Sequence, residues 1–224
     1  IAEADESDGS FLKYSPFISV VTNIEGDHFD FYRDIDEIKN SFAKFISNTS
    51  PDGFVIMNGD EPLLRDISRL SNGEVVYYGI NPENHIYAED IKFANFTSSY
   101  TLVITGRDGK RKKLEIFLNV PGIHNVKNSL AALAVCYSLN FDMEKAAGIL
   151  RYFTGVRRRF EKRGEKKGVL IFDDYAHHPS EVRATLEAAA KEKKNRIIVV
   201  FQPHRYSRLA NLKDKFDGCF DESD

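Results

Sequence analysis

The sequence contains little cysteine and no long apolar run, and each of these absences argues against a class of protein. Cys136 and Cys219 lie far apart and match no metal or redox spacing, so we expect reduced thiols and no disulfide framework. No stretch approaches the roughly 18 apolar residues that cross a membrane. The first residues lack the basic segment of a signal peptide, and we therefore expect a cytoplasmic protein.

Basic residues are not in excess either. The 224 residues include 31 basic and 34 acidic side chains, which gives a formal net charge of -3. This balance favours neither nucleic acid nor an anionic membrane as the main partner. With 42% hydrophobic and 29% charged residues, the composition is typical of a globular protein with one large or two small domains.

Strand and helix patterns alternate along the first part of the chain. Residues 17–23 form a short β-branched apolar run, which predicts a buried strand of a parallel sheet. Asp34 and Glu37 predict the start of a helix over residues 34–48, because Asp is a preferred N-cap and an acid three residues later completes a capping box. The other elements expected before residue 86 are strands at 54–57 and 75–78 and a helix at 62–70.

The pattern changes in the second part of the chain. Polar and apolar residues alternate over 86–120, which predicts an antiparallel meander. Two helices are expected after it, and we place a domain boundary near residue 153. Because strands and helices alternate along the chain, the predicted fold class is α/β. The elements expected from residue 125 onward are helices at 125–139 and 143–152, a strand at 169–172, a helix at 179–191 and a strand at 196–201, an order that indicates a second parallel sheet.

Two acidic clusters lie near predicted strand ends. Residues 3–8 carry carboxylates that would repel one another in a compact fold unless a divalent cation such as Mg²⁺ lay among them. Residues 23–30 follow the first predicted strand and place His28 among acids, where its imidazole could ligate a metal or orient a carboxylate. The alternatives are a solvated acidic loop and a surface turn. Because ligands collect at the carboxyl ends of strands in open α/β sheets, the pair of clusters favours a metal site.

A third cluster, at residues 121–128, leads into the predicted small-residue helix. Asn125 and Asn128 lie three residues apart, so they share a helix face. Their amides offer both a donor and an acceptor, as recognition of an adenine edge requires. Simple N-capping by Asn125 is the alternative, and the two interpretations are compatible.

The fourth cluster is composite and brings together residues 155–161, 173–179 and 202–208. The last two segments each follow an expected strand, so their Asp, Tyr, His and Arg side chains should meet at one sheet edge. Arginine forks bind phosphate or carboxylate in a bidentate manner. A zinc site at His177 and His178 is disfavoured, because adjacent residues rarely ligate one metal and no cysteine lies nearby.

The four clusters, in this order, resemble the Mur ligase family. The resemblance extends from Glu3 to Arg208, and its runs look like those of the alanine-adding member of the family. It implies that residues 1–153 are the C-terminal portion of a central ATP-binding domain of P-loop type, with a mostly parallel sheet and a small antiparallel sheet. Residues 154–224 would then be the N-terminal portion of a Rossmann-like ligase domain. The runs that carry the resemblance are Glu-Ala-Asp-Glu-Ser-Asp, Asn-Ile-Glu-Gly-Asp-His, Asp-Asp-Tyr-Ala-His-His-Pro and, most specific, Phe-Gln-Pro-His-Arg-Tyr-Ser-Arg.

The resemblance also implies site residues. Glu3 and His28 would bind Mg²⁺. The residues that would bind ATP are His124, Asn125, Asn128, Arg159 and Asp174. The residues that would surround L-alanine are Tyr175, His177, His204, Arg205 and Arg208. Arg205 or Arg208 would take its carboxylate, and His177 or His204 could accept the proton of its amine.

The implied reaction is the ATP-dependent joining of L-alanine to UDP-N-acetylmuramic acid through an acyl phosphate, in peptidoglycan precursor synthesis in the bacterial cytoplasm. The chain departs from the family pattern in one respect, since it contains no Gly-x-x-Gly-Lys-Ser/Thr loop. We therefore expect a sequence truncated at both ends that is inactive by itself.

Three alternatives remain for the function. A muramyl-tripeptide recycling ligase or a folylpolyglutamate-type enzyme would share the fold, although residues 202–208 argue against both. A metal-dependent phosphohydrolase would also place acidic and histidine residues at strand ends. A non-catalytic nucleotide-binding module is the third.

Overall fold

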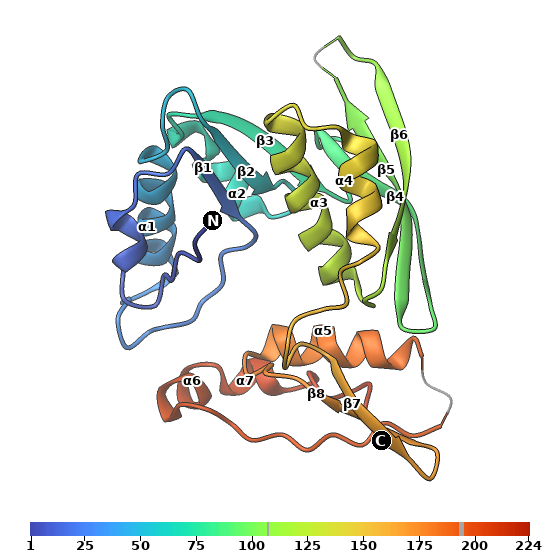
Figure 1. Ribbon diagram of the computed structural model, residues 1–224. Coiled ribbons are helices and arrows are strands. Elements are labelled where there is room, and N and C mark those ends of the chain that lie inside the picture. Colours follow the sequence, from blue (N-terminus) through green and yellow to red (C-terminus); the bar gives the residue numbers. More distant parts are fainter. Residues whose placement is uncertain (107, 193–194) are drawn as a thin grey trace.

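A six-stranded sheet, in the order β1-β2-β3-β4-β5-β6, organises most of the computed structural model, which describes residues 1–106, 108–192 and 195–224 (Figure 1). Strands β1 to β4 pair in parallel, and β4 to β6 continue the same sheet as an antiparallel meander. The predicted α/β class with a mostly parallel sheet is therefore confirmed. The strands are β1 (Ile18–Val21), β2 (Phe54–Asn58), β3 (Glu74–Gly79), β4 (Ile86–Ala94), β5 (Thr97–Thr105) and β6 (Arg111–Leu118).

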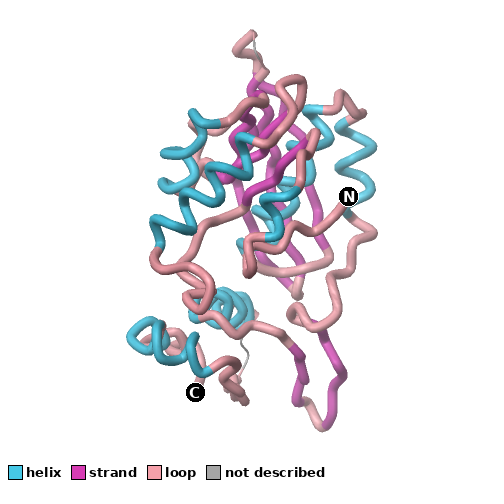
Figure 2. The backbone as a smooth tube through the Cα atoms, turned by 90° about the vertical axis from the view of Figure 1, so that its left-hand side faces the viewer, coloured by secondary structure: helices cyan, strands magenta, loops and turns pink. Residues whose placement is uncertain are grey.

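Helices cover both faces of this sheet, as Figure 2 shows. In β2, Val55 and Met57 pack toward one layer and Ile56 toward the other, and all three are fully buried. A strand that is buried on both faces must be apolar at successive positions, which explains the continuous apolar run. One layer holds η1 (Ser10–Lys13), α1 (Ile35–Ser47), α2 (Pro62–Ile67) and η2 (Ser68–Leu70), and the other holds α3 (Ile123–Ser138) and α4 (Met143–Leu150).

The start of α1 is anchored by the predicted N-cap, Asp34, whereas Glu37 accepts from Arg33, one residue before the position that a capping box requires. The Asp34 carboxylate accepts a hydrogen bond from the Glu37 N–H at 2.9 Å, and the Glu37 carboxylate accepts one from the Arg33 N–H at 2.7 Å. These bonds satisfy backbone donors that have no partner within the helix. The cap therefore fixes the end of the segment that leads from β1 to α1 and carries the acidic residues 23–30.

The C-terminal lobe, from β7 to α7, lies below the large sheet in Figure 1. Its strands form an antiparallel hairpin, whereas α5 packs against residues 197–201 and 216–220. Among the described residues no helix is long and apolar enough to cross a membrane. The predicted boundary at residue 153 falls between α4 and β7 and stays a prediction. The elements of this lobe are β7 (Glu161–Lys166), β8 (Val169–Asp173), α5 (Pro179–Ala190), α6 (Tyr206–Asn211) and α7 (Lys213–Phe216).

The predicted strand at 196–201 is wrong. The segment has the burial alternation of a strand, since Ile197, Val199 and Phe201 pack toward α5 while Ile198 and Val200 are exposed. However, a strand also needs a neighbouring strand with which to exchange backbone hydrogen bonds. Ile197 instead bonds to Asp224, through its N–H at 2.7 Å and its carbonyl at 2.9 Å. The described part of the lobe consequently contains no second parallel sheet.

Aromatic side chains join the two lobes at the turn between β4 and β5. The Phe96 ring lies 5.3 Å from that of Phe172, which stacks on Phe160 at 4.5 Å. Next to them, the Phe96 N–H donates to the Glu192 carboxylate at 2.9 Å, and the Lys191 ammonium lies 3.9 Å above the Phe93 ring. Since Lys191 and Glu192 follow α5, this contact holds the C-terminal end of that helix against the large sheet.

Truncating Leu102 tests the packing of the sheet. Leu102 lies in β5 and is fully buried in the core beside α3. We expect Leu102→Ala to lower the free energy of unfolding by about 2–5 kcal/mol, because the vacated space cannot close completely. Leu70→Ala, at a half-exposed position, should change it by less than about 1 kcal/mol. Urea unfolding followed by circular dichroism measures both, and equal losses would contradict the packing described here.

Candidate functional site

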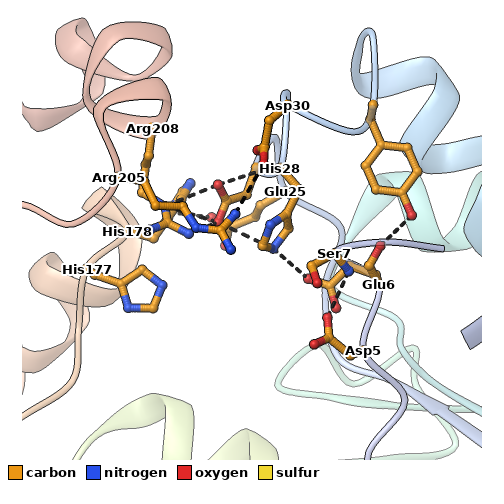
Figure 3. Close-up of polar contacts among 12 residues, drawn as sticks. Asp5, Glu6, Ser7, Glu25, His28, Asp30, His177, His178, Arg205 and Arg208 are labelled. Carbon is orange, nitrogen blue, oxygen red and sulfur yellow. Dashed lines mark hydrogen bonds and ion pairs between the residues drawn. The ribbon is translucent and has the colours of Figure 1, made fainter. Parts of the chain in front are cut away.

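Residues 23–30 face the C-terminal lobe and meet it through polar side chains, as Figure 3 shows. Glu25 contacts the start of α5, whereas Asp27 and Asp30 contact arginines at the start of α6. The sequence placed these acids at the end of β1, and the structure adds their partners. Clusters that are separated by more than 150 residues in the sequence therefore form one polar surface between the lobes.

The shortest of these ion pairs joins Asp27 and Arg208. Arg208 Nη2 donates to Asp27 Oδ2 at 2.8 Å, and Nε lies 3.1 Å from Oδ1 and 3.2 Å from Oδ2. Burial by itself would raise the pKa of Asp27, but the bond from Arg208, the His28 N–H and nearby positive charge hold it below its usual range. The pair thus stays charged at neutral pH in a site with little access to water.

A second interlobe contact involves the first turn of α5. The Ser180 hydroxyl donates to Glu25 Oε2 at 2.6 Å, and His178 Nδ1 lies 2.7 Å from that hydroxyl and 3.1 Å from the same carboxylate oxygen. His178 is the N-cap of α5, and Glu181 completes a capping box with it. The local cap and the interlobe contact therefore share the same side chains.

The two acidic clusters meet at His28. Its Nε2 lies 3.4 Å from Glu6 Oε1 and 3.6 Å from Asp27 Oδ2, while its buried Nδ1 has no hydrogen-bond partner among the described residues. Tyr32 holds this arrangement by donating to the Glu6 carbonyl at 2.6 Å. Glu3, the other predicted metal ligand, is exposed in the N-terminal segment.

The surroundings of His28 fit Mg²⁺ only in part. No group of three or more His, Cys, Asp or Glu in the described ranges could hold a metal by itself. Mg²⁺ usually takes one or two carboxylates and completes its shell with water and phosphate oxygens, which Glu6 and Asp27 beside His28 could allow. The pairing of Glu3 with His28 stays a prediction.

The third cluster opens helix α3. Gly122 is the N-cap, and its left-handed φ of 96° suits glycine because a Cβ there would lie 2.6 Å from the His124 ring. Asn125 is therefore not the N-cap, and its amide donates instead to the Pro121 carbonyl at 2.7 Å. Asn128 is exposed on the first turns of the same helix.

Predicted nucleotide residues of the C-terminal lobe surround the start of α5. Both oxygens of Asp174 accept backbone hydrogen bonds at 2.7 Å, from the Phe160 and Ala176 N–H groups. Arg159 Nη1 lies 3.3 Å from Glu181 Oε1. Burial lowers the pKa of His124, and the charges of Asp174 and Arg159 from the other lobe raise and lower it respectively.

The residues predicted to surround an amino acid also come together. The Tyr175 and His177 rings are 5.0 Å apart, and the His177 and His204 rings are 6.4 Å apart. Arg205 Nη1 reaches Asp30 at 3.4 Å, with a side chain that is 43% exposed. His177 and the exposed Arg205 lie on the side of the lobe that faces residues 23–30 (Figure 3), and the His204 ring lies near that of His177.

Sequence reasoning missed the roles of Ser180 and Glu181. Burial would raise the pKa of Glu181, but the His177 and His178 N–H groups and the charges of His177 and Arg159 hold it below its usual range. A local signal was present, because Pro179 at a first helical turn with an acid two residues later is typical of a capped helix start. The interlobe bond from Ser180 had no such signal.

Removing His124 tests its environment. Burial, with contributions from Arg159 and Lys191 and against the charge of Asp174, lowers the pKa of His124 below its ordinary value of 6.5. The unfolded chain then takes up a proton before the folded one does, so stability is lost as the pH falls below about 6.5. We expect His124→Asn to lose less unfolding free energy than the parent between pH 7.5 and 5.5 in urea titrations. Equal losses would show that His124 titrates normally.

Two family models match the chain, one in each lobe. Residues 2–136 match the model of the Mur ligase middle domain, and residues 158–222 match that of the Mur ligase, glutamate ligase domain. The UDP-N-acetylmuramate–L-alanine ligases of Desulfatibacillum aliphaticivorans and Geotalea uraniireducens are 42% and 43% identical to the chain, over all of it and 48% of each relative. The chain spans about half the length of these curated relatives.

Solved structures of Mur ligases have a similar fold. The crystal structure of UDP-N-acetylmuramate–alanine ligase from Thermotoga maritima matches 99% of the chain and 47% of its own, with 31% identity and a TM-score of 0.78. The MurF ligase of Thermotoga maritima in complex with ADP, at 22% identity and a TM-score of 0.66, matches 80% of the chain and 40% of its own and shows the shared fold. On the basis of its family-model matches, supported by these relatives, the chain belongs to the Mur ligase family.

Proposed function

We propose that the protein joins L-alanine to UDP-N-acetylmuramic acid with the use of ATP, as a step of peptidoglycan precursor synthesis in the bacterial cytoplasm. The observation that carries this proposal is the polar surface between the lobes, where Arg205 reaches Asp30 of the acidic segment 23–30 and the His177 and His204 rings lie 6.4 Å apart. The names of the relatives at about 42% identity support the choice of substrates.

The proposed chemistry has two steps. The muramyl carboxylate attacks the γ-phosphorus of ATP, so that an acyl phosphate forms and ADP leaves. The amine of L-alanine then attacks the acyl carbon, phosphate leaves, and the nitrogen loses a proton as the amide forms. Neither step needs a covalent enzyme intermediate, which agrees with a site that is rich in arginine, histidine and carboxylate. The work of the protein is to align the reactants and to balance their charge.

We assign ATP to the boundary between α3 and the start of α5. His124, Asn125 and Asn128 would face the base, while Arg159 and Asp174 would reach the phosphates and the ribose from the other lobe. A relative with the same fold binds ADP, which supports the assignment. Mg²⁺, held near His28 by Glu3 or by the adjacent carboxylates, would neutralise phosphate charge when bound.

We assign L-alanine to the face of the C-terminal lobe that carries Tyr175, His177, His204, Arg205 and Arg208. An arginine fork matches the planar carboxylate of an amino acid. His177 or His204 would accept the proton that the amine loses, since imidazole exchanges protons near neutral pH.

Phosphate release by the full-length protein tests the proposal. With ATP, Mg²⁺ and UDP-N-acetylmuramic acid, release should depend on L-alanine and should be at least tenfold slower with glycine, D-alanine or a tripeptide. Phosphate release without any amine would indicate a phosphohydrolase, and a preference for the tripeptide would indicate a recycling ligase.

The Arg205→Lys variant tests the carboxylate site. Lysine keeps the charge but loses the fork, so we expect the KM for L-alanine to rise about tenfold or more while the KM for ATP changes less than twofold. Arg163→Lys, at an exposed position of β7, is the matched control and should leave both constants unchanged. An unchanged KM for L-alanine in Arg205→Lys would exclude Arg205 from the amino-acid site.

A further inference from the structure

Arg208 is buried within an otherwise exposed stretch. Its neighbours from residue 202 to residue 207 are exposed, whereas Arg208 retains 6% of its accessible surface. Its guanidinium is engaged on two sides, because Nε and Nη2 donate to Asp27 and Nη1 donates to the His204 carbonyl at 3.2 Å. Because its side chain is only 4% exposed, little of the guanidinium is accessible to a second carboxylate.

Arg205 has the opposite character. Its side chain is 43% exposed and, among the described residues, makes one polar contact, of 3.4 Å with Asp30. Its backbone, however, has φ of 67° and ψ of 123°, a conformation that non-glycine residues rarely adopt. Such strain persists only where surrounding contacts hold it in place, and here the His204 carbonyl before it is bound by Arg208 and the Arg205 carbonyl accepts from the Leu209 N–H.

Asp27 anchors this arrangement from the other lobe. Besides Arg208, its carboxylate accepts the His28 N–H at 2.8 Å, and His28 itself has a left-handed φ of 55°. One carboxylate thus bridges two backbone turns that are unfavourable for their residues. Replacing it would leave the Arg208 charge buried without its partner, which is more damaging than losing an exposed ion pair.

We propose that Asp27 is a positioning residue for the amino-acid end of the site. It holds Arg208 and, through the His204 carbonyl, fixes the strained turn that presents the exposed fork of Arg205. This assignment rests on the proposed function and narrows it, because Arg205 then takes the carboxylate of the amino acid and Arg208 keeps Arg205 in place.

Kinetics of the full-length protein test this division of roles. We expect Asp27→Asn to raise the KM for L-alanine at least tenfold, with the KM values for ATP and UDP-N-acetylmuramic acid within about twofold, and Asp27→Glu to restore part of the loss. Asp30→Asn is the matched control from the same segment. It removes only an exposed carboxylate that competes for Arg205, so the KM for L-alanine should stay the same or fall.

Amide hydrogen exchange gives a readout that is independent of turnover. The Leu209 N–H, which bonds to the Arg205 carbonyl, should exchange at least tenfold faster in Asp27→Asn and at the parental rate in Asp30→Asn. The proposal would be overturned if Asp27→Asn left the KM for L-alanine within twofold of the parent, or if Asp27→Asn and Asp30→Asn raised it equally. Unchanged exchange of the Leu209 N–H in Asp27→Asn would also overturn it. If phosphate release by the parent protein does not depend on L-alanine, the proposed function is wrong. This outcome is distinguishable, because the parent is measured before any variant.

Discussion

The bidentate contact between Asp27 and Arg208 is the interaction on which the polar surface between the lobes depends. It joins the segment after β1 to the segment before α6, and the contacts of Glu25 with Ser180 and Asp30 with Arg205 lie beside it. Removing two charges from water is costly, and close bidentate geometry is what offsets this cost. The pair of Asp30 and Arg205 is exposed and has no bidentate geometry, so it contributes little to holding the lobes together.

The N-terminal lobe could be predicted largely from local patterns. The apolar run in β2 and the N-cap at Asp34 depend on neighbours in the sequence, and both predictions are confirmed. The segment 196–201 shows the limit of such patterns, because its alternation is real but a strand also requires a partner, which local sequence does not specify.

The candidate site could be predicted as a set of residue types and not as a set of contacts. Residues 23–30 were recognised as acidic and close to a strand end, yet the sequence could not tell that Asp27 faces Arg208 while Asp30 faces Arg205. That choice depends on how α5 and α6 lie against the large sheet. The burial of a single arginine within an exposed stretch is likewise a property of the assembled lobes.

Helix α5 lies across the boundary between the lobes and is fastened at both ends. Near its C-terminus are the rings of Phe93 and Phe96, whereas Ser180 in its first turn bonds to Glu25. Its 12 residues make a rod about 18 Å long. If the aromatic contact served as a pivot, a swing of only about 10° would carry the far end by roughly 3 Å, which would stretch the 2.6 Å bond from Ser180 to Glu25 beyond hydrogen-bond range. A small rotation of one lobe would thus suffice to open the polar surface while the rings remained together.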